Sequence, residues 1–252
     1  MFYSKRLKKE INISHCFFNR LGGKSKGIYK SLNCGRGSKD KKKYISKNLN
    51  IVSKKISNSY KELILLNQIH SNKFFFLNDY KLKKKRLVGD ALLTNRRKLI
   101  IGVLTADCVP VLLYDKKLKI ISAIHAGWKG AYKGIIKKVV KHLKERGSES
   151  KNIIAAIGPC ICQKNYEVKS DFKSKFIKQS RNNKFFFKFV KNKTYFSLNK
   201  YVKYQLISLG IKKIDIINKD TYNKKNNFFS ARRSIHNKEN DYGRNISLIM
   251  IN

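Results

Sequence analysis

Apolar residues fall into short runs along the chain, and polar, lysine-rich segments separate these runs. Runs of strand length predict strands over residues 11–19, 63–68, 73–77, 91–94, 99–104, 109–114, 119–124, 153–157, 213–217 and 246–251. Apolar residues at helical spacing predict helices over 38–55, 131–146 and 199–209. A further helical segment is expected after Val168.

This order of strands and helices predicts an α/β fold with a mixed central sheet flanked by helices. A chain of 252 residues is long enough for one large domain with a full hydrophobic core. Two small domains would also fit this length, but we find no internal repeat and no linker that would divide the chain. We therefore expect a single layered domain over residues 1–252.

Segment 104–134, LTADCVPVLLYDKKLKIISAIHAGWKGAYKG, carries two side chains of metal-binding type. Cys108 precedes, and His125 follows, two predicted strands joined by a turn, so the two side chains can lie close together. His70 stands in a turn just after another predicted strand. One thiolate and two imidazoles suit zinc and leave a fourth position for water, which is typical of a catalytic site. Because the three residues are far apart in the sequence, their spacing alone does not establish the site.

Two acids and three arginines are further candidates. Asp90 and Asp107 lie at strand ends beside the metal candidates, so we expect them to carry protons or to orient a ligand. The alternative for each is an ordinary surface carboxylate. Arginine binds phosphate through two parallel hydrogen bonds and is scarce here beside lysine. This favours a role in anion binding for Arg232, Arg233 and Arg244.

The glycine-rich segment 31–37 is a candidate for binding the substrate. It contains Asn33, which we assign to substrate binding, and its backbone N–H groups could receive an anion. A long surface loop would explain the same glycines. Cys160 and Cys162 are one residue apart, so an extended backbone would direct them to opposite faces. We interpret both as ordinary thiols.

Composition adds a formal net charge of +43, from 58 lysines and arginines against 15 acids. A basic surface for nucleic acid would explain this charge, and so would a general excess of lysine throughout the chain. The lysines are spread over all segments, and no arginine-rich tail or known recognition motif occurs, so nucleic acid is not favoured as the main partner. Five cysteines, no secretory signal and no apolar run of about 20 residues indicate a cytoplasmic protein that does not enter membranes.

Several motifs resemble the YfiH-type laccase-domain family, whose members are also described as polyphenol oxidase-like or purine nucleoside phosphorylase-like. They are GGKSKGIYKSLNCG, NQIHS, GDALLTN, LTADCVPVLLYD, AIHAGWKGAYKG, IGPCICQKNYEV, FFSARR and the later Tyr-Gly-Arg. The resemblance implies a single α/β domain with a zinc site at His70, Cys108 and His125, where copper is also possible. It further implies phosphorolysis of purine nucleosides (adenosine, inosine, guanosine and methylthioadenosine), with adenosine deamination as a side activity. The partners would then be purine nucleosides and phosphate.

The chain departs from the family pattern at three places: Lys129 stands where arginine is common, Thr221 lacks the usual preceding cysteine, and Ala231 replaces a tyrosine. Authentic laccase chemistry is disfavoured, since five histidines are too few for a full multicopper set once two belong to the zinc site. Two alternatives stay open: an amide hydrolase that edits cell-wall precursors with the same metal site, and a basic nucleic-acid-binding protein with a structural zinc. These patterns do not determine the oligomeric state or the preferred nucleoside.

Overall fold

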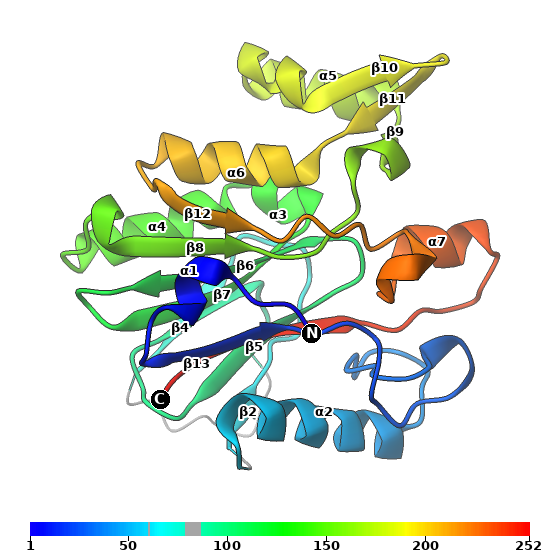
Figure 1. Cartoon of the computed structure of the whole chain (residues 1–252). Helices are drawn as coiled ribbons and strands as arrows, with labels where there is room; N and C mark the ends of the chain where they lie inside the picture. Colours follow the sequence, from blue (N-terminus) through cyan, green and yellow to red (C-terminus); the bar gives the residue numbers. More distant parts are fainter. Residues whose placement is uncertain (60, 79–86) are drawn as a thin grey trace.

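Two stacked sheets form the centre of the molecule, and helices cover their outer faces (Figure 1). The computed structural model describes residues 1–59, 61–78 and 87–252. The six-stranded sheet has the order β12 (Lys213–Ile216), β8 (Ile153–Ile157), β6 (Val109–Asp115), β7 (Ile120–Ala126), β4 (Ala91–Thr94) and β3 (Phe74–Leu77). The four-stranded sheet has the order β1 (Ile13–Phe17), β13 (Asn245–Ile251), β5 (Ile100–Thr105) and β2 (Leu63–Ile64).

Both sheets are mixed. In the larger sheet, β12 pairs with β8 and β3 pairs with β4 in parallel, while the inner pairs are antiparallel. In the smaller sheet, β2 and β5 are parallel, and β13 is antiparallel to both of its neighbours. The α/β class predicted from the sequence is therefore confirmed. The predicted single central sheet is instead two packed sheets, with a third small sheet at one end of the molecule.

Alternate residues of each inner strand enter different cores. In β6, Val111 and Leu113 pack toward α4 (Ile135–Glu145) and α6 (Leu198–Ser208), while Leu112 and Tyr114 pack against the smaller sheet. A third core lies between the smaller sheet and α2 (Lys42–Ser57). Strands buried on both faces need apolar side chains at almost every position. This is why these segments appear in the sequence as continuous apolar runs.

The third sheet, β10 (Phe187–Val190), β11 (Lys193–Phe196) and β9 (Glu167–Val168), lies beside α5 (Ser170–Gln179) at the top of Figure 1. Three short helices are α1 (Lys5–Lys8), α3 (Trp128–Tyr132) and α7 (Ala231–His236). Short 3-10 helices cover Gly27–Tyr29, Ser150–Asn152, Gln163–Asn165, Arg181–Phe186 and Lys224–Asn226. In the described part of the chain, no helix is long and apolar enough to cross a bilayer.

Two expected elements differ from the structure. The helix expected over 131–146 is interrupted at Gly134, whose backbone is left-handed (φ 79°), so α3 and α4 are separate helices. The strand expected over 63–68 is formed at Leu63 and Ile64, and beyond these residues Asn67 makes an isolated bridge to Val88 before the chain turns toward His70. As a result, α3 follows β7 directly, and the chain after Ile64 reaches the turn that contains His70.

Candidate metal centre

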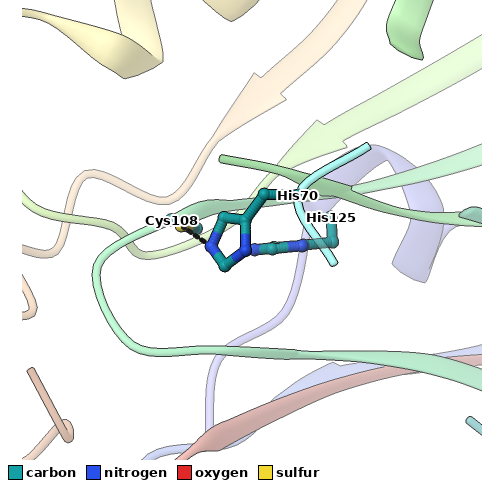
Figure 2. Close-up of side chains that lie close together, drawn as sticks. All are labelled: His70, Cys108 and His125. Carbon is teal, nitrogen blue, oxygen red and sulfur yellow. Dashed lines mark hydrogen bonds between the residues drawn. The ribbon is translucent and has the colours of Figure 1, made fainter. Parts of the chain in front are cut away.

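Three side chains that are distant in the sequence meet at one point, as Figure 2 shows. His70 lies in the turn after β2, Cys108 in the turn between β5 and β6, and His125 in β7. Their ligand atoms all lie within 4.8 Å of one another, and Cys108 Sγ is 3.8 Å from His70 Nε2. Antiparallel pairing places Pro110 opposite His125, which brings Cys108 to the end of β7. The sheet register therefore assembles the set that segment 104–134 contains only in part.

Asp90, at the start of β4, fixes the position of two of these side chains. Its carboxylate is fully buried and accepts hydrogen bonds from His125 Nδ1 (2.8 Å) and from the backbone N–H of His70 (2.9 Å). Ser71 donates to it twice, through its N–H (2.6 Å) and its hydroxyl (2.7 Å). Burial opposes ionisation, but the bonds from His125 and Ser71 prevail and lower the pKa of Asp90 to about 2. An ionised Asp90 orients the His125 ring so that Nε2 faces Cys108 and His70.

Gly127 lets the three side chains approach one another. A Cβ atom at this position would lie 2.8 Å from His70 Cδ2 and 2.9 Å from Cys108 Sγ. The backbone of Gly127 is ordinary (φ −67°), so the requirement for glycine here is one of space and not of conformation. The centre is therefore tightly enclosed on the side of Gly127.

The electrostatics of the centre favour a thiolate. Although burial raises the pKa of the Cys108 thiol, the neighbouring imidazoles of His125 and His70 lower it to about 6. Burial also lowers the pKa of His125, but Cys108 and Asp90 outweigh this effect and raise it to about 9. A thiolate and two imidazoles within mutual contact form a donor set that suits zinc, and a divalent ion would replace the proton that His125 holds.

A cavity of about 290 Å³ opens onto this set. His70, Cys108 and His125 form part of its wall, and the glycine-rich loop forms another part through Gly35, Arg36 and Gly37. Its remaining lining residues are Leu66, Asn67, Gln68, Leu104, Thr105, Ala106, Tyr242 and Arg244. A cavity of this size with two arginines at its wall can hold a small anionic or polar molecule next to the metal ligands.

Asp107 precedes Cys108 in the sequence, but its side chain binds a different part of the chain. Its carboxylate accepts hydrogen bonds from Thr221 Oγ1 (2.6 Å), Ser230 Oγ (2.9 Å) and the backbone N–H of Arg232 (2.7 Å). Burial raises its pKa, and these bonds oppose that effect. Of the two roles expected for Asp107, these contacts favour orientation: the residue ties the turn that presents Cys108 to the start of α7.

Of the residues expected to bind substrate, Arg244 lines the metal cavity and Asn33 does not. Asn33 is fully buried, donates to Ser38 and Asp40, and accepts from the N–H groups of Gly35 and Arg244. It therefore shapes the glycine-rich loop and does not face the cavity. Arg244 does line the cavity, beside the aromatic ring of Tyr242.

The other two arginines expected to bind anions lie outside the metal cavity. Arg232 donates to the Glu167 carbonyl (3.1 Å) and lies over the ring of Tyr166. Arg233 is buried and donates to the carbonyls of Thr221, Tyr222 and Phe228. Cys162 donates to Asp220 (3.1 Å) and burial raises the pKa of Cys160, as expected for ordinary thiols.

Sequence reasoning missed three residues at the cavity. Arg36 and Tyr242 contribute to its wall, and Gln68 makes two bonds with the backbone of Leu104 (2.7 and 2.8 Å) that hold the chain before His70 against β5. Arg36 lies in segment 31–37, which the sequence already indicated as a possible anion-binding loop. No local pattern marks Gln68 or Tyr242, because their importance comes from strands that meet only in the folded chain.

Comparison with known proteins identifies a family and sequence relatives for this chain. The family described as multi-copper polyphenol oxidoreductase laccase matches residues 14–252. A purine nucleoside phosphorylase of Rickettsia conorii is 37% identical over 215 residues, which cover 81% of this chain and 88% of the relative. A purine nucleoside phosphorylase of Haemophilus influenzae is 32% identical over 241 residues, which cover 94% of each chain.

Solved structures show the same fold. The hypothetical protein YfiH of Bacillus licheniformis superposes with a TM-score of 0.88 at 25% identity, over 97% of this chain and 95% of that chain. A protein of Neisseria meningitidis superposes with a TM-score of 0.85 at 27% identity, over 96% and 95% of the two chains. The architecture and the sequence relatives thus point to the same group of proteins.

Proposed function

This chain belongs to the family described as multi-copper polyphenol oxidoreductase laccase, and we propose that within this family it is a zinc-dependent purine nucleoside phosphorylase. Its substrates would be phosphate and purine nucleosides such as adenosine, inosine, guanosine and methylthioadenosine. Adenosine deamination would be a side activity. The names of the sequence relatives support the phosphorylase activity. The zinc ion, the four nucleosides and the deamination are parts of our proposal.

One observation carries the proposal: the metal-ligand set and two arginines line the same cavity. Phosphorolysis requires a phosphate anion to approach the C1′ atom of a nucleoside, and a pair of guanidinium groups binds phosphate oxygens well. Arg36 and Arg244 would perform this task, because both line the cavity, and Asp241 holds Arg244 through an ion pair of 3.2 Å. The high positive charge of the whole chain would also attract phosphate toward the cavity.

The chain's own residues would have separate tasks in this reaction. Arg36 and Arg244 would hold phosphate while one of its oxygens bonds to C1′ and the bond from C1′ to the purine nitrogen breaks, and the departing purine would take up the proton that the phosphate loses. A zinc ion bound by His70, Cys108 and His125 would supply Lewis-acid chemistry and a water of lowered pKa. Asp90 would keep the His125 ring in the orientation required for metal binding.

The arrangement of histidines disfavours multicopper oxidation, which the family description suggests. The chain has five histidines, and only His70 and His125 belong to the set beside Cys108. His15 accepts a hydrogen bond from Ser4, His142 contacts Arg146, and His236 contacts Tyr222. A full blue-copper and trinuclear set therefore has too few imidazoles at the centre.

The decisive test incubates the purified chain with adenosine in the presence and absence of phosphate. We expect adenine and ribose 1-phosphate only when phosphate is present, and inosine from a slower, phosphate-independent reaction. Metal analysis should give one zinc per chain, and His70→Ala should lose both zinc and activity. His142→Ala is the matched control, because His142 lies on α4 away from the centre and its loss should leave both unchanged.

Two results would contradict the proposal. One is a zinc-loaded chain that forms no phosphate-dependent product from any of the four nucleosides. The other is full retention of zinc by His70→Ala. Release of an amino acid from a cell-wall peptide precursor by the same preparation would favour the amide hydrolase instead.

A further inference from the structure

A second cavity of about 290 Å³ lies beside α7 and is built around two arginines. Its lining residues are Arg20, Gly27, Ile28, Phe229, Ser230, Arg233, Ser234 and Glu239. None of them lines the metal cavity. Ser230, at the wall of the second cavity, donates its hydroxyl to Asp107, the residue that precedes Cys108.

Arg20 is held rigidly at one wall of this cavity. Its backbone N–H donates to the Asn227 carbonyl (2.8 Å), and its own carbonyl accepts from the N–H groups of Ser31 and Leu32. Its Nε donates to the Lys30 carbonyl, and its guanidinium lies 4.7 Å from the centre of the Phe229 ring. The ring and these bonds fix the side chain before any ligand arrives, which lowers the entropic cost of binding.

Arg233 is equally fixed on the other side. Only 8% of its surface is exposed, and its terminal nitrogens donate to the carbonyls of Thr221 (2.7 Å), Tyr222 (2.8 Å) and Phe228 (2.5 Å). Carbonyl oxygens orient a guanidinium but do not neutralise it. A buried positive charge is costly unless an anion pairs with it.

Neither arginine has such a pair among residues 1–59, 61–78 and 87–252, where no carboxylate lies within 4.0 Å of Arg20 or Arg233. Glu239 lines the cavity and attracts Arg20, and Asp107 attracts Arg233, but neither acid forms an ion pair with these arginines. Burial lowers the pKa of Arg20, and repulsion from Arg233 lowers it further. Two arginines held by backbone carbonyls therefore line one cavity, and the neighbouring acids only partly balance their charge.

We propose that this cavity is a second anion site, separate from the metal centre, that binds the phosphate group of a small phosphate monoester. Two guanidinium groups match the oxygens of a phosphate, and the buried hydroxyl of Ser234 supplies a further donor. The cavity is larger than a phosphate ion, so it has room for a small organic group as well. Inorganic phosphate presents the same chemistry and serves as the probe.

The test is titration of inorganic phosphate into the full chain by calorimetry at low ionic strength. Arg20→Gln should weaken one class of binding sites by about 10-fold or more, because it removes one of the two guanidinium groups. Arg146→Gln is the matched control: Arg146 also lies over a phenylalanine (Phe76, 4.3 Å) and carries the same charge, but it lines neither cavity. General attraction by the net charge would fall equally in both variants.

Glu239→Gln gives a test of opposite sign that does not depend on the stability of Arg20→Gln. Removing the one acid at the cavity should tighten phosphate binding several-fold. Unchanged binding in Arg20→Gln, or weaker binding in Glu239→Gln, would overturn the proposal. Failure of the proposed phosphorylase activity would not overturn it, because that activity belongs to the metal cavity, which shares no lining residue with the second cavity.

Discussion

At the scale of single residues, the geometry of the proposed metal centre depends on two residues that are not among its proposed ligands. Asp90 orients His125 and the turn of His70, and Gly127 leaves the space in which the ligand atoms meet. Neither would supply a donor atom of the proposed set. Their substitution should therefore change metal affinity without removing a ligand.

Asp90→Asn should reduce zinc affinity about 10- to 100-fold, because an amide binds His125 Nδ1–H more weakly than a carboxylate does. Competition with a chromogenic chelator measures this affinity. Asp115→Asn is the matched control, since Asp115 is equally buried and also accepts backbone bonds, from Lys117 and Leu118 (2.8 Å each), but lies at the far end of β6. Both variants should lose about 1 to 3 kcal/mol of unfolding free energy. An equal loss of zinc affinity in both would refute the orienting role of Asp90.

Gly127→Ala should weaken zinc binding by at least about 10-fold while the chain still folds, because the added methyl group competes for space with His70 and Cys108. Metal content after dialysis against a weak chelator is the measurement. Gly37→Ala serves as the control for metal content, since a Cβ there meets no atom within 4 Å. Full zinc retention by Gly127→Ala would show that the centre has more room than its geometry indicates.

At the scale of elements, the break between α3 and α4 lets the chain change direction soon after His125. Gly134 takes a left-handed conformation, so α3 follows β7 directly while α4 starts in a new direction across the larger sheet. α4 then buries Ile135, Ile136, Val139, Val140 and Leu143. The apolar spacing of α4 was predicted correctly, and only its first residues were wrong.

Gly134→Ala should reduce the free energy of unfolding by about 1 to 2 kcal/mol, since a Cβ atom disfavours φ near 79°. Steric clash would contribute little, because the added Cβ would lie 3.8 Å from its nearest neighbour, Lys137 Cβ. Asn at the same position should cost less, because asparagine adopts the left-handed region more readily. Chemical denaturation compares the three proteins, and equal stability of the alanine and glycine forms would exclude this explanation of the break.

At the scale of the whole molecule, the N-terminal segment joins the two main sheets. Ser4 donates to Asp215 of β12 through its hydroxyl (2.6 Å) and to His15 of β1 through its N–H (2.8 Å). His15 is 4% exposed, and burial lowers its pKa to about 4, although Asp215 acts in the opposite direction. The neutral imidazole is therefore an acceptor in the folded chain, and its protonation opposes folding.

This predicts a loss of stability in mild acid. His15 has an ordinary pKa near 6.5 when unfolded, so the unfolded chain binds the proton first as the pH falls. The contribution of His15 is complete above about pH 6.5 and declines toward pH 4, by about 2 kcal/mol between pH 7 and 5. The unfolding free energy of the native chain should fall by this amount more than that of His15→Gln over the same range. Parallel pH profiles of the two proteins would contradict the prediction.

The sequence by itself determined the elements that local pattern controls. Continuous apolar runs marked the strands buried on both faces, helical spacing marked α2, α4 and α6, and the chemistry of His70, Cys108 and His125 marked a candidate metal-ligand set. These signals are local, because an apolar run or a ligand-type side chain is visible in any short window. The sequence motifs also identify the family.

Only the tertiary structure decided how these parts combine. It divided the strands between two stacked sheets, directed Asp107 toward α7, buried Asn33 and Arg233, and brought Arg36 to the cavity wall. The physical reason is that each outcome depends on contacts between residues far apart in the chain. Strand pairing across the sheets sets those contacts, and no local pattern encodes the partner of a strand. The same long-range packing placed Arg20 beside Arg233 and formed the second cavity.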